Sequence, residues 1–163
     1  KDIVKKKNLK ALVTTGPTRE YLDPVRYISN ESSGKQGYEI AVALNKLGIK
    51  TTVIAGPSNY KTPKGIKVKK VTSADEMMLN VKESLPVDLA VCAAAVADFK
   101  PMLKKNKKIK KDEIESNSIV LKKNNDILEF LSKNNKSRPR IVAGFAAETD
   151  NLTKNSLSKI KNK

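Results

Sequence analysis

The chain has 163 residues, 39% of them hydrophobic and 31% charged, which is enough for one domain with a buried core. Its 33 lysines and arginines outnumber 17 acidic residues, so the formal net charge is +16. One cysteine and no histidine exclude a disulfide framework, a Ser-His-Asp triad, a Cys-His pair and a histidine metal site within this chain. Any chemistry must therefore use lysine, arginine, carboxylate and amide side chains and backbone dipoles.

The excess charge comes almost entirely from lysine, because the only arginines are Arg19, Arg26, Arg138 and Arg140. Aromatic residues make up 4% of the chain, whereas nucleic-acid-binding proteins often place aromatic rings between basic residues to stack on bases. We attribute most of the charge to solvated lysines and part of it to a polyanionic ligand such as a nucleoside triphosphate. We expect no nucleic-acid partner.

The hydropathy and the ends of the chain indicate its location. No apolar run approaches the roughly 20 residues of a membrane span, and the charged residues 1–7 lack the apolar segment of a signal peptide. The chain does not start with methionine and stops within a helix-like segment, so we interpret it as a piece of a longer chain. We expect a cytoplasmic protein with no membrane partner.

Short apolar runs alternate along the chain with segments of helical periodicity. Strands are expected at residues 11–15, 51–55, 65–71, 88–93, 118–122 and 141–145, and helices at 34–47, 73–85 and 126–131. Gly48 supplies a C-cap for the first helix, and Ser73 with Glu76 forms a capping box for the second. The alternation predicts an α/β fold, a Rossmann-like, doubly wound, mainly parallel sheet with helices on both faces.

Three polar segments follow apolar strands. Residues 16–33 form a long loop before the first helix, and loops of this length are usually functional or disordered. The other two are residues 94–98 and 144–149. Because ligands bind at the carboxyl ends of strands in open parallel sheets, we expect a site built from these segments.

The segment 32–37 opens the first helix with small residues. Such residues let backbone N–H groups approach a phosphate, and the helix dipole favours negative charge there. Ordinary N-capping by Ser33, with close packing at Gly37, explains the pattern equally well. The Walker pattern is absent, because Gln36 stands where serine or threonine is required.

Other polar residues also carry two interpretations. Arg26 is suited to hold a phosphate bidentately or to lie in a solvated loop. Asp98 suits a ribose hydroxyl or a base amino group, or else an N-cap or an ion pair with nearby lysines. The basic run at 104–111 lies on a loop that we expect to be mobile, and a solvated surface segment is the simpler interpretation. Cys92 is interpreted as a buried small hydrophobic residue.

Taken together, these motifs resemble those of the bacterial phosphopantothenate–cysteine ligase family. The motifs are T-x-G-P-T-R-E at 14–20, D-P-V-R-x-I-S-N at 23–30, S-S-G-x-x-G at 32–37, A-x-V-A-D at 94–98, K-x-K-K at 108–111 and G-F-A-A-E-T at 144–149. They stand in the family's order and spacing and cover nearly all of the chain. The family's C-terminal part, with further strands and lysines, is missing.

The resemblance implies a ligase of coenzyme A biosynthesis. In this family the carboxylate of 4'-phosphopantothenate attacks the α-phosphate of CTP, pyrophosphate leaves and an acyl-cytidylate forms. The amine of cysteine then attacks the acyl carbon and releases CMP. CTP is thus a cosubstrate and Mg²⁺ a cofactor, with unknown metal ligands. Lysines, backbone amides and Mg²⁺ can supply the positioning and charge neutralisation that such phosphoryl transfer requires.

The same resemblance assigns roles to individual residues. Asn30 would hydrogen-bond the acyl-cytidylate and hold its carbonyl for attack, and Lys108, on a flexible flap, would neutralise phosphate charge. The nucleotide site would contain Ala94, Asp98, Lys108, Asn125, Asp126, Ile127 and Phe145. Residues 124–127 lack the proline of the family's N-P-D-I segment. Arg26, Ser33 and Gly34 would serve phosphate groups or the subunit interface.

The resemblance also implies a domain arrangement and partners. Residues 1–9 would be a linker or tail, and 10–163 a single nucleotide-binding ligase domain truncated at its C-terminus. In many bacteria this domain is fused behind a flavin-dependent decarboxylase, which would then be part of the full-length protein. The family's members complete their site near a two-fold interface, so we expect a homodimer.

A nicotinamide-dependent short-chain reductase is the main alternative. A strand, a glycine-containing helix start and a second strand ending near residue 55 fit that fold, and Tyr60 and Lys64 match its Tyr-x-x-x-Lys catalytic spacing. Pro63 lies between them, however, and no acidic residue for the ribose ends the second strand. A lysine-rich nucleic-acid-binding module is the third alternative.

Overall fold

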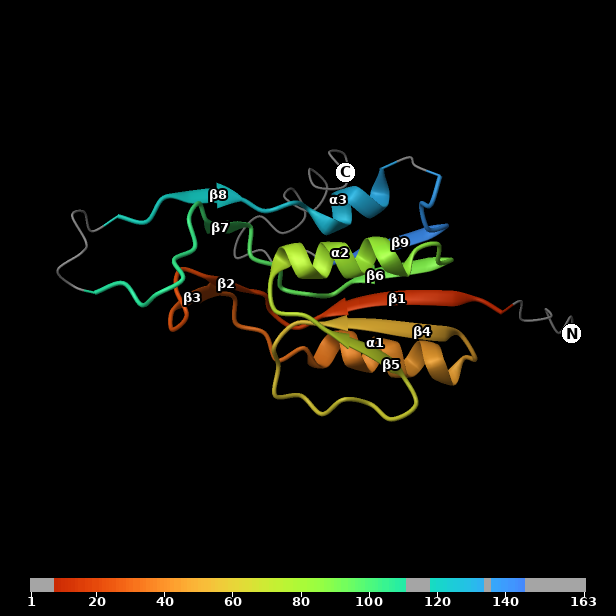
Figure 1. Ribbon diagram of the computed structural model, residues 1–163. Helices are drawn as coiled ribbons and strands as arrows, with labels where there is room; N and C mark the ends of the chain where they lie inside the picture. The colour runs from red at the N-terminus through yellow and green to blue at the C-terminus, as the bar shows by residue number, and fades with distance from the viewer. Residues whose placement is uncertain (1–7, 111–117, 134–135, 146–163) are drawn as a thin grey trace, which may run out of the picture.

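The computed structural model describes residues 8–110, 118–133 and 136–145. Within them, a five-stranded parallel sheet has the order β5-β4-β1-β6-β9 (Figure 1). Its strands are β1 (Lys10–Thr15), β4 (Lys50–Ala55), β5 (Lys67–Lys70), β6 (Leu89–Cys92) and β9 (Ile141–Gly144). The order reverses at β1, which pairs with β4 on one side and β6 on the other. A ligand crevice is therefore expected at the carboxyl end of β1.

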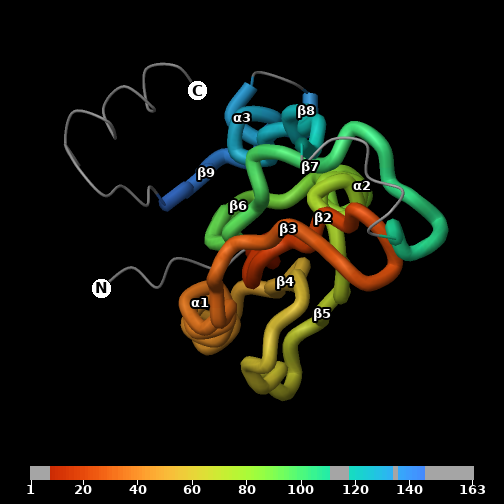
Figure 2. Tube along the Cα trace, turned by 90° about the vertical axis from the view of Figure 1, so that its left-hand side faces the viewer, coloured from red at the N-terminus to blue at the C-terminus, as the bar shows by residue number. Residues whose placement is uncertain are grey.

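Helices cover both faces of this sheet (Figure 2). Successive side chains of β1 point to opposite faces, so Leu12 joins one core cluster and Val13 the other. On the Val13 face, α1 (Lys35–Lys46) packs through its buried side chains, whereas α2 (Ala74–Ser84) and α3 (Ile127–Ser132) pack on the Leu12 face. The predicted doubly wound α/β fold is confirmed. None of the helices in the described ranges is long and apolar enough to span a membrane.

Two antiparallel pairs of short strands lie beyond the carboxyl ends of the sheet (Figure 1). In one, β2 (Arg19–Tyr21) pairs with β3 (Tyr27–Ser29); in the other, β7 (Phe99–Pro101) pairs with β8 (Leu121–Lys123). Contacts between β2 and β7 join the pairs. We refer to residues 19–29, 99–110 and 118–123 as the arm.

The arm corrects part of the sequence-based prediction. Residues 16–33 are predicted as a loop, yet β2 and β3 lie within them, and β7 is a strand that was not predicted. The strand predicted at 118–122 occurs as β8, which begins three residues later and ends one residue later. Strands of three residues are too short to show the alternation by which strands are predicted.

Candidate functional site

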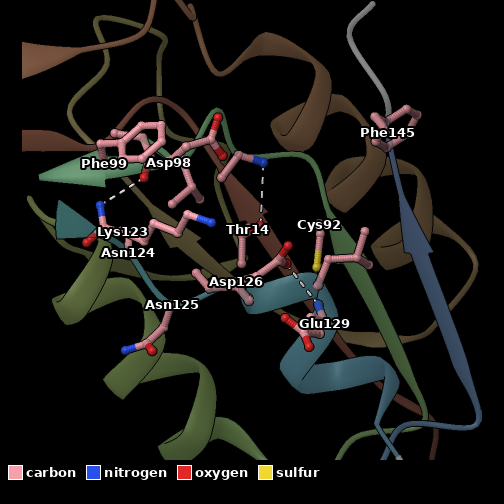
Figure 3. Close-up of a pocket in the computed structure, with 15 residues that line it drawn as sticks. Thr14, Cys92, Asp98, Phe99, Lys123, Asn124, Asn125, Asp126, Glu129 and Phe145 are labelled. Carbon is pink, nitrogen blue, oxygen red and sulfur yellow. Dashed lines mark hydrogen bonds between the residues drawn. The ribbon is translucent and has the colours of Figure 1, made fainter. Parts of the chain in front are cut away.

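A cavity of about 680 Å³ opens at the carboxyl ends of β1 and β6 (Figure 3). It is named the β6–α3 pocket here. Its lining consists of Thr14, Cys92, Ala94, Val96, Ala97, Asp98, Phe99, Lys123, Asn124, Asn125, Asp126, Ile127, Leu128, Glu129 and Phe145. All residues predicted to bind nucleotide, except Lys108, are in this set. The structure therefore brings together residues that are up to about 50 positions apart in the chain, from Ala94 to Phe145.

The register of the sheet explains this convergence. Thr14 of β1 pairs with Cys92 of β6, and Cys92 pairs with Gly144 of β9, so three strands end at one level. The N–H of Ala94 lies 3.4 Å from Thr14 Oγ1, and Phe145 follows β9 with 53% of its surface exposed. Cys92 is only partly buried and lines the pocket, which corrects the prediction of a buried position.

The acidic residues of the pocket differ in their contacts. Asp98 is exposed, and within the described residues its carboxylate forms no ion pair and caps no helix, so a ligand can reach it. Asp126 instead caps α3, because its Oδ1 accepts a hydrogen bond from the N–H of Glu129 at 2.9 Å. Ile127 is only 4% exposed and belongs to the core cluster under α3. Glu129, the third acidic residue of the lining, pairs with Lys133 at 2.7 Å, so Asp98 is the carboxylate of this pocket best placed to meet a bound molecule.

A second cavity, of about 470 Å³, lies between the β2–β3 strands and the loop after β4, and is named the hairpin pocket. Its lining consists of Pro17, Arg19, Tyr27, Ser29, Asn30, Glu31, Ser32, Ser33, Pro57, Ser58, Asn59 and Tyr60. The Nδ2 of Asn30 donates to the backbone oxygens of Val96 and Ala95 at 3.2 and 3.4 Å. Since Val96 lines the β6–α3 pocket, Asn30 stands between the two cavities.

The start of α1 forms one side of the hairpin pocket. Its N-cap residue is Gly34, whose φ of +73° favours glycine. Ser33 is therefore not the N-cap residue itself, but its Oγ accepts a hydrogen bond from the N–H of Lys35, the first residue of the helix, at 3.3 Å. The close packing predicted at Gly37 is confirmed, because a Cβ there would lie 2.4 Å from the Cβ of Thr15.

Arg26 forms an ion pair with Asp23 in the turn between β2 and β3. Its Nε and Nη2 donate to Oδ2 of Asp23 at 2.9 and 2.5 Å. The Asp23 side chain is fully buried, whereas that of Arg26 is 46% exposed. The guanidinium of Arg26, with N–H donors from Val25, Arg26 and Ile109, holds the pKa of Asp23 well below its ordinary value despite the burial. Arg26 is thus not a free loop side chain, and its role toward phosphate stays a prediction.

Lys108 is exposed on the segment between β7 and β8, and it is outside the lining of both pockets. The next residue, Ile109, forms hydrogen bonds through both of its backbone polar groups. The N–H of Ile109 donates to Oδ2 of Asp23 at 3.2 Å, and its carbonyl accepts from Nη2 of Arg26 at 2.8 Å. The loop predicted to be mobile therefore has a fixed point on the β2–β3 turn.

The family resemblance gave no role in the site to two residues of the hairpin pocket, Arg19 and Tyr60. Arg19, whose guanidinium lies 4.6 Å from the ring centre of Tyr27, lines the hairpin pocket, as does Tyr60. Tyr60 stacks on Tyr38 and donates to Oε1 of Glu39 at 2.6 Å, and this bond raises the pKa of Tyr60. A raised pKa opposes the phenolate chemistry of a reductase, so the Tyr60 contacts argue against that alternative.

The described residues contain no cluster of three or more histidine, cysteine or carboxylate side chains able to hold a metal ion. Some predicted positions cannot be placed: residues 1–7 of the linker, Lys111 and residues 146–149 of the last motif lie outside the described residues.

Comparison with known proteins covers almost the whole chain. Residues 6–163 match the family described as DNA/pantothenate metabolism flavoprotein C-terminal domain. The coenzyme A biosynthesis bifunctional protein CoaBC of Borreliella burgdorferi is 43% identical over 162 residues, which cover 96% of this chain and 40% of that protein. CoaBC of Escherichia coli is 42% identical over 149 residues, covering 90% of this chain and 36% of that protein. The chain thus spans less than half the length of these curated relatives.

Solved structures agree with this family. A crystal structure of the C-terminal domain of CoaBC is 35% identical, with a TM-score of 0.80 over 95% of this chain and 72% of that one. A Cab2 mutant in complex with phosphopantothenate-cysteine is 18% identical, with a TM-score of 0.72 over 96% of this chain and 70% of that one, which concerns the fold alone. The chain therefore belongs to the DNA/pantothenate metabolism flavoprotein C-terminal domain family, which confirms the resemblance identified from its motifs.

Proposed function

We propose that this chain is a phosphopantothenate–cysteine ligase, which uses CTP to join 4'-phosphopantothenate to cysteine in coenzyme A biosynthesis. The observation that carries the proposal is the position of Asn30, which lines the hairpin pocket and donates to the backbone of Val96, a residue that lines the β6–α3 pocket. A reaction through an acyl-nucleotide requires a nucleotide site and an acyl site that meet at the reacting atoms. The names of the relatives, and the compound bound to the Cab2 mutant, support the same assignment.

In the first step, the carboxylate of 4'-phosphopantothenate attacks the α-phosphorus of CTP, and pyrophosphate leaves. Asp98 would accept a hydrogen bond from the ribose or from the cytosine amino group, and Phe145 would offer an exposed aromatic face to the base. Ser33 and Gly34 would bind phosphate at the start of α1, where the N–H of Lys35 donates to Ser33 Oγ at 3.3 Å and the helix dipole favours an anion. Lys108 would neutralise the charge that develops on pyrophosphate.

In the second step, the amine of cysteine attacks the acyl carbon, and CMP leaves. Asn30 would hold the acyl carbonyl through its Nδ2. Its present bonds, at 3.2 and 3.4 Å, lie at the long end of the usual range, so a substrate carbonyl can replace one of them at little cost. The orientation of Asn30 by Ala95 and Val96 would then be kept by the remaining bond.

Mg²⁺ fits this proposal as an ion that arrives with the nucleotide. It is usually held by one or two carboxylates together with substrate phosphates, and does not require a cluster of protein ligands. Because Asp98, the exposed carboxylate of the same pocket, would bind the nucleoside, the phosphates would supply most ligands of the ion. When bound, Mg²⁺ would stabilise negative charge on the phosphates.

The arrangement of the whole protein is part of the proposal. Residues 10–163 would be the ligase domain without its C-terminal part, preceded by a linker at 1–9 and, as the name bifunctional in the relatives supports, by a decarboxylase domain. Exposed apolar side chains on the arm, such as Val25 (59%), Leu103 (73%) and Val120 (63%), support a homodimer through this region. Light scattering should detect the dimer, and a species that stays monomeric at high concentration would contradict it.

The direct test is pyrophosphate release with 4'-phosphopantothenate, Mg²⁺ and each nucleotide in turn. We expect CTP to be used at least about tenfold better than ATP, because each mismatched buried hydrogen bond to a base costs about 1–3 kcal/mol. Cysteine should not be needed for the first release of pyrophosphate, but should be needed for release of CMP. Equal or better use of ATP would refute the choice of CTP as the nucleotide. A lack of pyrophosphate release with every nucleotide would refute the proposed reaction.

A further inference from the structure

We propose that Asp23 is a positioning residue, which holds the segment that carries Lys108 against the β2–β3 turn. The inference rests on the proposed function for the role of Lys108, and on the hydrogen bonds of the described residues for the mechanism of holding. The side chain of Asp23 is buried with both oxygens engaged. A buried carboxylate that is outside the lining of both pockets needs a structural or positioning explanation.

The two oxygens of Asp23 have separate tasks. Oδ1 accepts from the backbone N–H groups of Val25 and Arg26, both at 2.9 Å, and so shapes the turn. Oδ2 accepts from the guanidinium of Arg26 and from the N–H of Ile109. The carbonyl of Ile109 in turn accepts from Arg26 at 2.8 Å, so the Asp23–Arg26 ion pair is hydrogen-bonded to both backbone polar groups of Ile109. We refer to Asp23, Arg26 and Ile109 as the clasp.

The clasp acts next to Lys108 because Ile109 is its neighbour in the chain. A second bond, from the N–H of Lys105 to the carbonyl of Leu22 at 2.8 Å, fixes the segment four residues earlier. Lysines in this run repel one another, which favours an open segment, and the clasp opposes that tendency. Fixing Lys108 before the ligand binds lowers the entropy that must be lost when it meets the phosphates.

The same hairpin positions the second candidate catalytic residue. Asn30 follows the last residue of β3 directly, and Asp23 lies in the turn that joins β2 to β3. The hairpin would therefore present Asn30 by its own backbone and Lys108 through the clasp. Loss of Asp23 should impair the step that depends on Lys108 and leave intact the step that depends on Asn30.

The substitution Asp23→Asn tests the clasp selectively. The amide oxygen can replace Oδ1 and keep the turn, but the NH₂ group in place of Oδ2 would face the donors of Arg26 and Ile109. Trypsin cleaves after lysine, and the bond after Lys108 contains the N–H that Asp23 holds. In Asp23→Asn, we expect the initial rate of cleavage after Lys108, divided by the rate after the exposed Lys64, to rise about tenfold or more. Glu83→Gln, which removes an exposed ion pair with Lys69 elsewhere, should leave the ratio unchanged.

The functional test of the positioning role is a double-mutant cycle, in which the rate of acyl-cytidylate formation by this chain is measured. Asp23→Asn should slow this step, and adding it to Lys108→Gln should cause less than about a twofold further loss, since both changes remove the same contribution. Additive losses would overturn the positioning role. An unchanged cleavage ratio in Asp23→Asn would overturn the clasp itself, whether or not the wild-type chain makes acyl-cytidylate. Should Asp23→Asn fail to fold, Arg26→Gln decides by the same cleavage ratio, which must rise.

Discussion

The central sheet and the arm are held together by different interactions. In the sheet, Val13, Val53, Ile54 and Ala90 are fully buried, and neighbouring strands share the cores on both faces. In the arm, strands are three residues long, large apolar side chains such as Leu103 are exposed, and buried polar groups make the long-range contacts. The sheet therefore supplies most of the folding free energy, whereas individual hydrogen bonds set the geometry of the arm and of the residues it carries.

The largest effect expected from this comparison is on stability. Leu12→Ala, at a site that is 1% exposed in the sheet core, should lower the free energy of unfolding by about 2–5 kcal/mol. Leu103→Ala, at a site that is 73% exposed in the arm, should change it by less than about 0.5 kcal/mol. Urea titration of dilute protein, followed by circular dichroism, measures both. Similar losses for the two variants would show that Leu103 is part of the hydrophobic core, which would contradict the contrast between the sheet and the arm.

The same contrast explains how much of the fold could be predicted. Strands such as β1 and β4 contain apolar runs and are followed directly by Gly16 and Gly56, and this local pattern is enough to predict them. The arm depends on contacts between distant residues, such as the bond between Ile109 and Asp23, which are 86 positions apart. No local pattern encodes such a pairing, so residues 16–33 could be predicted only as a polar loop.

The candidate site shows a similar division. Its location follows from the rule that strand ends carry ligands, and the family resemblance predicted six of the fifteen residues that line the β6–α3 pocket. The partners of Asn30 and Arg26 could not be predicted in the same way, because they belong to the tertiary structure. One signal was available: Asp23 and Arg26 have opposite charges three positions apart, a spacing at which a turn can bring them together.

The next effect concerns catalysis and separates the role of Lys108, in the arm, from that of Asn30, which directly follows the arm strand β3. Removing one positioned donor costs about 2.7–4 kcal/mol in the step that it serves. Asn30→Ala should impose this loss on the attack by cysteine, so acyl-cytidylate should accumulate. Lys108→Gln should instead slow acyl-cytidylate formation, because a neutral side chain cannot offset the charge of pyrophosphate. Quenched-flow with labelled CTP resolves the two steps, and a loss confined to the first step in both variants would refute the division.

A smaller effect tests the sheet side of the site. Asp126→Ala removes the cap of α3 and should lower stability by about 1 kcal/mol. Because α3 begins in the wall of the β6–α3 pocket, nucleotide affinity should fall as well. Ser73→Ala is the matched control, since it removes the cap of α2, whose start is not in that wall. Calorimetric titration with nucleotide should therefore distinguish two variants of similar stability, and equal affinities would contradict the placement of the site.

The smallest effect is that of pH on the clasp. We expect no change in its stability near neutral pH. The pKa of Asp23 is lowered in the folded protein, so its carboxylate stabilises the clasp at every pH above the ordinary aspartate value of about 3.9. That contribution is lost only as the pH falls further, through the lowered value. Hydrogen exchange at the Ile109 amide, corrected for intrinsic rates and compared with Val13 in β1, should therefore show constant protection from about pH 8 to about pH 5. In Asp23→Asn, protection at Ile109 should be low throughout, without a step in acid, while Val13 remains protected. A loss of protection near neutral pH in the unsubstituted chain would mean that a group other than Asp23 controls this bond.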